Sequence, residues 1–194
     1  MIQSRADYLY YIESDRIALG KPVRNLKIRI KEFLFPDPIW KFQRIMRRLE
    51  YYSNVKKCGV YFICITLTRL KYRKISRQLG FTIPINIFAE GLAIAHYGTI
   101  VINSKAKVGK NCRIHPCTSI GASGGSSQAP QLGDNIYIAP GVKIYGDISI
   151  ASNIAIAANA AVGKSFKEEG ILIGGVPAQK IKGINISTII RHIG

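Results

Sequence analysis

Histidine is the side chain best suited to proton transfer near neutral pH, and the chain has three: His96, His115 and His192. An imidazole can take a proton from a hydroxyl group and give it back, because it titrates close to the working pH. Three histidines can also hold a zinc ion. His96 and His115 are 19 residues apart, so the elements that position them decide which chemistry is open to them.

A repeat of six residues organises the second half of the chain. Counting in sixes from residue 102 to residue 162 gives eleven positions, of which ten are aliphatic and one, at 126, is Ser. Strands alternate with a period of two and helices with a period of 3.6, so neither produces this spacing. It predicts a parallel β-helix, in which three short strands make one coil of about 18 residues. The aliphatic positions are Ile102, Val108, Ile114, Ile120, Leu132, Ile138, Ile144, Ile150, Ile156 and Val162.

The repeat is interrupted at residues 121–131, which are rich in Gly and Ser. If this segment fills two six-residue units, Ile120 and Ile138 belong to the same column of side chains. If six of its residues form a loop outside the coil, all later positions move to the next face. Insertions in repeat proteins often carry function, and a surface loop without function is the alternative.

The first 80 residues have a different character: they hold 18 of the 28 Lys and Arg residues and little Gly. Apolar residues recur at three- and four-residue steps over residues 39–49, which predicts a helix. A second helix is predicted from Val60 to Leu79, where Gly80 would end it. We therefore expect a helical region over residues 1–80, the β-helix over 81–185, and a C-terminal surface tail with His192 over 186–194.

Composition excludes several classes of protein. Hydrophobic residues make up 47% and charged residues 20%, as in globular domains and unlike disordered chains. The four cysteines form no CxxC pair, which argues against a disulfide framework and a structural zinc site. No secretory signal or membrane-spanning stretch is visible, so a cytoplasmic location is the default expectation. The net charge of +17 predicts attraction to anions, while no nucleic-acid-binding motif is present.

These features together resemble the hexapeptide-repeat acyltransferases, in particular the serine O-acetyltransferase branch and its relatives found with polysaccharide-synthesis enzymes. The resemblance rests on the repeats, on His96 within residues 91–98, on the Gly-rich loop after Ile120, and on the ending at residues 174–178. It implies a mainly β fold: a left-handed parallel β-helix preceded by a small α-helical region. It also implies a homotrimer that binds acetyl-CoA in the groove between adjacent subunits.

The catalytic histidine of that family corresponds to His96. The resemblance therefore implies direct transfer of an acetyl group from acetyl-CoA, with His96 as the general base. His115 lies one coil plus one residue later and is expected beside it, as a substrate-binding residue or as a stacked corner histidine. Glu90, Asn86 or a backbone carbonyl could orient His96, and Glu90 and Asn86 are assigned to the substrate site with His115. Because only two histidines lie in the repeats, the three-histidine zinc site of carbonic anhydrases with this fold is not expected, and no metal is predicted.

The later coils are predicted to bind acetyl-CoA. Small residues there leave room for the pantetheine arm, and two lysines could meet its phosphates, although each lysine could equally be a solvated surface charge. Backbone N–H groups of the Gly-rich segment could bind the developing oxyanion or the pantetheine amides. The predicted cofactor-binding residues are Gly121, Ala122, Ala139, Ala157, Lys164 and Lys182.

The chain lacks charged residues that the serine O-acetyltransferase branch uses. Its aspartate next to the catalytic histidine is Ala95 here, its upstream aspartate is replaced by Phe81, and its Arg-His pair before a proline reads Gln128-Ala129. A zwitterionic amino acid needs charged partners, whereas a sugar hydroxyl does not. The main expectation is therefore acetyl transfer to a saccharide in capsule or exopolysaccharide synthesis. The alternatives are an L-serine O-acetyltransferase of cysteine biosynthesis and a non-catalytic trimeric scaffold.

A basic run from Arg69 to Arg77 follows the largely apolar stretch from Val60 to Thr68. This order predicts either an interfacial helix on anionic lipid at the inner face of a membrane, or a helix that contacts other subunits and turns its basic side to solvent.

Overall fold

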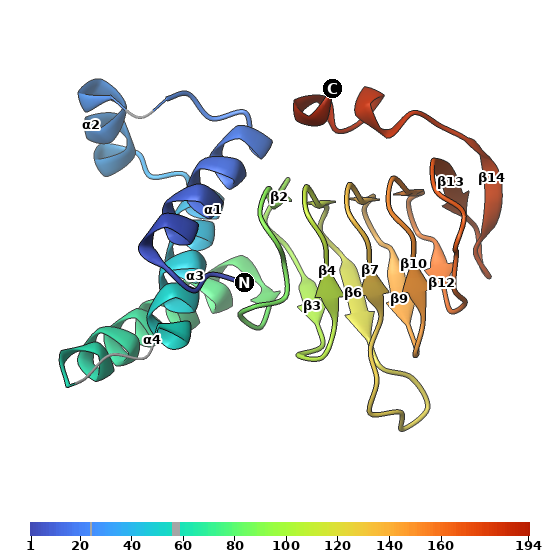
Figure 1. The fold of residues 1–194 in the computed structure, drawn as a ribbon, viewed down its shortest axis with the longest axis horizontal. Helices are drawn as coiled ribbons and strands as arrows, with labels where there is room; N and C mark the ends of the chain where they lie inside the picture. The colour runs from blue at the N-terminus through green and yellow to red at the C-terminus, as the bar shows by residue number, and fades with distance from the viewer. Residues whose placement is uncertain (24, 56–58) are drawn as a thin grey trace.

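The computed structural model describes residues 1–23, 25–55 and 59–194, so Cys58 lies outside the described residues. Figure 1 shows a helical region at one end of the molecule and a stack of short strands at the other. In the described part the helices are α1 (Arg5–Ala18), α2 (Leu26–Leu34), α3 (Pro38–Asn54) and α4 (Val60–Leu79), followed near the C-terminus by the short 3₁₀ helices η1 (Ile186–Thr188) and η2 (Arg191–Ile193).

Local sequence signals explain where α3 and α4 begin and end. The Asp37 carboxylate accepts hydrogen bonds from the backbone N–H groups of Ile39 and Trp40 and so caps the start of α3. At the other end of the region, α4 stops at Gly80, whose φ of 77° is easily reached only without a Cβ atom. Both helices predicted from the sequence are therefore present.

The strands form three sheets that run along the stack, one per face of the coil. The first contains β1 (Phe81–Thr82), β3 (Ile100–Ile102), β6 (Thr118–Gly121), β9 (Lys143–Tyr145) and β12 (Ala161–Val162). The second contains β4 (Lys107–Val108), β7 (Gln131–Leu132) and β10 (Ser149–Ile150). The third contains β2 (Ala93–Ile94), β5 (Arg113–Ile114), β8 (Tyr137–Ile138), β11 (Ala155–Ile156), β13 (Ile171–Gly174) and β14 (Gln179–Gly183).

The strands pair in parallel within each sheet, except that β14 is antiparallel to β13. Each face contributes a column of buried aliphatic side chains to the interior, such as Ile114, Ile138 and Ile156 from the third sheet. These columns are the six-residue positions of the sequence, because every such side chain points into the coil. The prediction of a left-handed parallel β-helix preceded by helices is confirmed.

The pairing register settles how the Gly- and Ser-rich interruption is accommodated. Ile102 pairs with Ile120, 18 residues on, but Ile120 pairs with Ile144, 24 residues on. Six extra residues therefore leave the coil as a loop, and the later positions move to the next face. The loop is the long excursion below β6 and β9 in Figure 1.

The end of the chain folds back along the outer surface of the third sheet (Figure 1). Ile186 and Ile190 are buried there against Ala155. His192 is half-buried, with its Nε2 atom 3.3 Å from Asn111 Oδ1. The segment is therefore packed on the surface of the β-helix. Within the described ranges, none of the helices has the length and apolar character needed to cross a membrane.

Candidate functional site

His96 lies at a corner of the β-helix that is two residues longer than its equivalents. Eight residues separate the buried Ile94 from the buried Ile102, whereas six separate Ile114 from Ile120 in the next coil. The backbone must accommodate the two extra residues by bulging outward. His96 is consequently exposed at the surface, in the turn between the third and first sheets.

His115 occupies the same corner in the next coil, as predicted from its spacing. The centres of the His96 and His115 rings are 6.2 Å apart. The His115 ring also makes an edge contact with Tyr137, at 5.3 Å between centroids, and its Nε2 atom is buried with no hydrogen-bond partner among the described residues. Burial, with the positive charge of Arg113 and the neighbouring His96, lowers the pKa of His115 below its usual value.

The two imidazoles form a surface site with distinct properties. His96 is accessible to a ligand, while His115 is held neutral near pH 7 by its buried surroundings. A hydroxyl group bound between them could give its proton to one ring and keep a hydrogen bond to the other. The arrangement suits proton transfer at a small hydroxyl-bearing molecule.

Small residues continue the His96–His115 corner along the β-helix. Backbone N–H groups at this corner donate hydrogen bonds to the next coil along the chain: Ala95 N–H to Ile114 O, and Ala139 N–H to Ile156 O. Ala157 follows in the same column, and a Cβ atom added to Gly174 would lie 2.8 Å from the Ala157 Cβ. Two predicted cofactor-binding residues, Ala139 and Ala157, therefore share a corner with the histidines.

The other four predicted cofactor-binding residues lie elsewhere. Gly121 and Ala122 are at the far end of β6, where the loop leaves the coil, so the first sheet separates them from the histidine corner. Lys164 follows β12 on that same far edge, and its Nζ atom donates to Gln179 Oε1 at 2.6 Å. Lys182 is exposed on β14, at the end of the third sheet. One subunit thus presents these residues along two different edges.

Glu90 and Asn86, the candidates to orient His96, have other partners in this structure. Glu90 forms an ion pair with Lys110 at 3.2 Å. Burial would raise the pKa of Glu90, but its hydrogen bonds and the charge of Lys110 lower it. Asn86 exchanges two side-chain hydrogen bonds with Asn54 of α3, at 2.9 and 3.0 Å. Their assignment to the substrate site stays a prediction.

Sequence reasoning missed the residues of α3 that hold the strand before His96. The buried Gln43 side chain donates to Leu92 O at 2.7 Å and accepts from Ile94 N at 3.3 Å. Because β2 is the edge strand of the third sheet, the Gln43 amide takes the place of a neighbouring strand. A signal existed: Gln43, Arg47 and Glu50 recur at four- and three-residue steps, which puts three polar side chains on one side of a helix.

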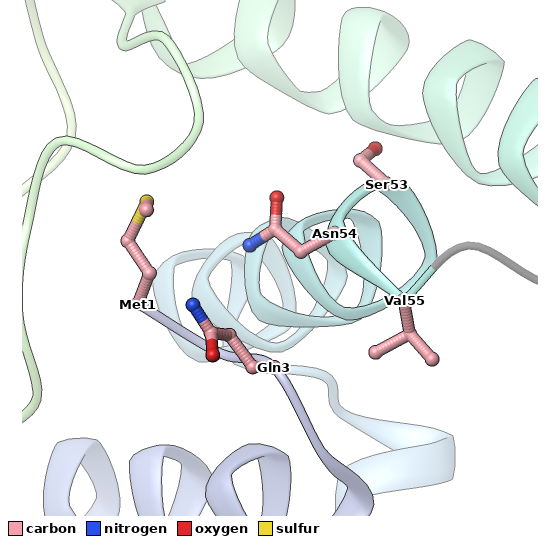
Figure 2. Close-up of a pocket in the computed structure, with 5 residues that line it drawn as sticks. All are labelled: Met1, Gln3, Ser53, Asn54 and Val55. Atoms are coloured by element: carbon pink, nitrogen blue, oxygen red, sulfur yellow. The ribbon is translucent and has the colours of Figure 1, made fainter.

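A pocket of about 540 Å³ lies between the start of the chain and the end of α3. Figure 2 shows the five side chains that line it: Met1, Gln3, Ser53, Asn54 and Val55. It contains no predicted site residue. None of the five side chains that line it is charged.

Neither metal binding nor cysteine chemistry is indicated in the part of the chain that the structure describes. No group of three or more His, Cys, Asp or Glu side chains there could hold a metal ion. Cys64, Cys112 and Cys117 are free thiols, and burial raises the pKa of Cys112 well above its usual value. A thiol with so high a pKa is a poor nucleophile.

Comparison with known proteins finds likenesses to serine acetyltransferases. No family model matches the sequence. The serine acetyltransferase of Staphylococcus aureus strain Mu50 is 31% identical over 105 residues, covering 52% of this chain and 49% of the relative. The chain therefore spans about half the length of the curated relatives it matches.

Solved structures give the same result for the fold. The Neisseria gonorrhoeae serine acetyltransferase in complex with serine has a TM-score of 0.65 and 22% identity, covering 92% of this chain and 71% of that one. The Brucella abortus serine acetyltransferase in complex with coenzyme A has a TM-score of 0.69 and 20% identity, covering 93% and 70%. These likenesses extend over the helical region as well as the β-helix.

The expectation of a saccharide acceptor in polysaccharide synthesis is wrong, because the relatives and the structural neighbours are serine acetyltransferases. The absence of the family's charged residues at Ala95, Phe81 and Gln128-Ala129 does not outweigh these likenesses. The chain is a left-handed β-helix with the fold of the serine acetyltransferases, and its two repeat histidines meet at one corner of that fold.

Proposed function

We propose that this protein is an acetyl-CoA-dependent O-acetyltransferase whose acceptor is L-serine. The observation that carries the proposal is the pairing of the exposed His96 with the half-buried His115, 6.2 Å apart, on a fold similar to the serine acetyltransferases. One of those relatives was solved with serine and another with coenzyme A, which supports both halves of the reaction.

In the proposed reaction, His96 acts as the general base. The serine hydroxyl oxygen attacks the carbonyl carbon of the thioester while His96 takes the hydroxyl proton. The carbon–sulfur bond then breaks, and the proton passes to the sulfur, giving an acetyl ester and free coenzyme A. His115 stays neutral and offers a hydrogen bond from the adjacent coil, because its pKa is lowered by burial. No residue of the chain is acetylated in this scheme.

Acetyl-CoA would lie along the histidine corner. Ala139 and Ala157 leave space there for a pantetheine arm. Gly121, Ala122 and Lys164 lie on the opposite edge of the first sheet, so they would reach the donor only from a second subunit. This division supports a homotrimer, in which each groove is formed by the histidine corner of one subunit and the loop edge of its neighbour.

Arg113 is a positively charged residue near His115 that could hold the carboxylate of serine in the absence of the usual charged groups. It lies two residues before His115 on β5, and its positive charge helps to lower the pKa of both His115 and His192. An arginine can bind a carboxylate through two parallel hydrogen bonds. Phe81, which replaces a family aspartate, is instead buried against Phe42 of α3 and contributes to packing.

The direct test is release of thiol from acetyl-CoA by the purified protein, with L-serine as acceptor and a blank that lacks an acceptor. The blank is needed because the protein's own cysteines react with thiol reagents. We expect serine-dependent release, and we expect His96→Ala to lower kcat by about 10²–10⁴ because the general base is lost.

His192→Ala is the matched control, since it removes the histidine that packs outside the repeats. Its rate should stay within a few-fold of the parent. An active His96→Ala variant, or thiol release that does not depend on serine, would overturn the proposal. A parent protein that binds acetyl-CoA but transfers nothing to serine would favour the non-catalytic scaffold.

A further inference from the structure

Helix α2 exposes a strongly apolar surface that no other described element covers. None of its residues is buried. Phe33 is 84% exposed and Leu26 is 71% exposed, and Phe35 just after the helix is 77% exposed. Soluble proteins seldom leave this much large apolar surface together unless it has a binding role. Figure 1 shows α2 on the side of the helical region remote from the β-helix.

The apolar side chains of α2 form one narrow stripe. At about 100° per residue, Leu26, Ile30, Phe33 and Leu34 fall within an arc of about 100°. The opposite side of the helix is turned to the protein. There, Glu32 accepts hydrogen bonds from Trp40 Nε1 at 3.1 Å and from Arg44 at 3.2 Å. The helix is therefore fixed to α3 with its apolar stripe facing outward.

Cations border this stripe on both sides. Lys27 and Lys31, one helical turn apart, flank one edge, and Arg29 flanks the other, all three exposed. Glu32, the one acidic residue of α2, lies on the inner side with Trp40 and Arg44. The outward surface of α2 thus combines bulky apolar groups with positive charge and carries no carboxylate.

We infer that α2 docks on an anionic lipid surface, with its apolar stripe among the acyl chains and its cations at the headgroups. An exposed apolar arc flanked by Lys and Arg is the pattern of helices that lie in a membrane interface. A second copy of this chain is a poor occupant, because it would bring the same cations together in a molecule whose net charge is already +17. The contact would leave the histidine corner of the β-helix free.

Co-sedimentation with lipid vesicles tests this inference. We expect the full chain to bind vesicles that contain about 30% phosphatidylglycerol in phosphatidylcholine, and to bind pure phosphatidylcholine far more weakly. Raising the salt from about 0.1 M to about 0.5 M should weaken binding, because the Debye length shortens. The lone tryptophan, Trp40, offers a second readout, since its indole nitrogen contacts α2.

Two pairs of substitutions separate the contribution of the cations to vesicle binding from that of the apolar stripe. Lys27→Gln with Lys31→Gln should lower vesicle binding about 10- to 30-fold, and Ile30→Ser with Phe33→Ser should also weaken it. All four residues are exposed, so we expect the circular dichroism spectrum of each variant to match that of the parent protein. Lys105→Gln with Lys167→Gln is the matched control, because it removes the same charge from exposed positions of the β-helix and should leave binding unchanged.

Three outcomes would overturn the inference. The first is failure of the parent protein to bind anionic vesicles. The second is an equal loss of binding in the Lys105 and Lys167 control, which would mean that net charge alone attracts the protein. The third is a fall in subunit assembly, rather than in vesicle binding, for the Ile30 and Phe33 variant, which would assign the stripe to a contact between subunits.

Discussion

Arg47 is fully buried and joins the helical region to the first coil of the β-helix. Its guanidinium pairs with Asp15 of α1 at 2.8 Å and with Glu50 at 3.0 Å, and it donates to Phe88 O and Ala89 O. Burial would lower the pKa of Arg47, but the two carboxylates outweigh it and raise the pKa above its usual value. A single side chain thereby ties two helices to the segment that leads to β2 and His96.

Replacing Arg47 tests how much the stability of the fold depends on its ion pairs with Asp15 and Glu50. Arg47→Met leaves two buried carboxylates without a cation, and we expect the free energy of unfolding to fall by about 3–5 kcal/mol. Chemical denaturation monitored by circular dichroism measures the change. Arg48→Met is the matched control: Arg48 is the exposed neighbour, and its loss should change stability by no more than about 0.5 kcal/mol. Equal stability of the two variants would contradict the interpretation of the cluster.

At the scale of a single element, the loop at residues 121–131 is an insertion that the β-helix accommodates outside its coil. The backbone enters from β6 and returns at Ala129 and Pro130, which are both buried, while residues 123–128 are exposed. The coil closes again at Lys107 N, which donates to Pro130 O, and at Leu132, which pairs with Val108. The columns of aliphatic side chains continue above and below the loop without a break.

Deleting residues 123–128 should therefore leave a regular 18-residue coil. We expect the melting temperature to change little, because no buried side chain is lost and the closure entropy depends only weakly on loop length. Thermal melting by circular dichroism tests this. If the loop completes a neighbour's groove, the deletion should lower serine-dependent thiol release while stability is kept. A deletion variant that fails to fold would show that the six residues are needed inside the coil.

At the scale of the whole molecule, two half-buried histidines link stability to pH. The pKa values of His115 and His192 are lowered from the usual 6.5, in both cases first by burial and then by the charge of Arg113. The unfolded chain therefore binds more protons than the folded chain below about pH 6.5. The stability that these neutral rings contribute is fully present above pH 6.5, and it is lost as the pH falls below 6.5 and through the lowered pKa values of the folded state.

We expect the free energy of unfolding to decrease as the pH falls from about 6.5 to about 5.5, before the carboxylates begin to titrate. Denaturation at several pH values measures this slope. The double variant His115→Asn with His192→Asn should have a flatter profile over the same range. A parent protein with no slope there would show that both rings take up protons as readily when folded as when unfolded.

The sequence by itself determined the elements that depend on local spacing. Aliphatic residues every six positions specify the β-helix, because each must point into a coil whose geometry repeats. Helix α3 follows from its apolar periodicity, and the end of α4 follows from Gly80. The meeting of His96 with His115 was also predictable, since residues about one coil apart lie side by side.

Only the tertiary structure decided how distant segments meet. The register of Ile120 with Ile144 shows that the interruption leaves the coil as a loop, a choice that the spacing alone left open. The partners of Arg47 and Gln43 lie up to 51 positions away in the chain, and the packing of the tail around His192 spans 81. Such contacts depend on which buried polar groups packing brings together, and no local pattern encodes that.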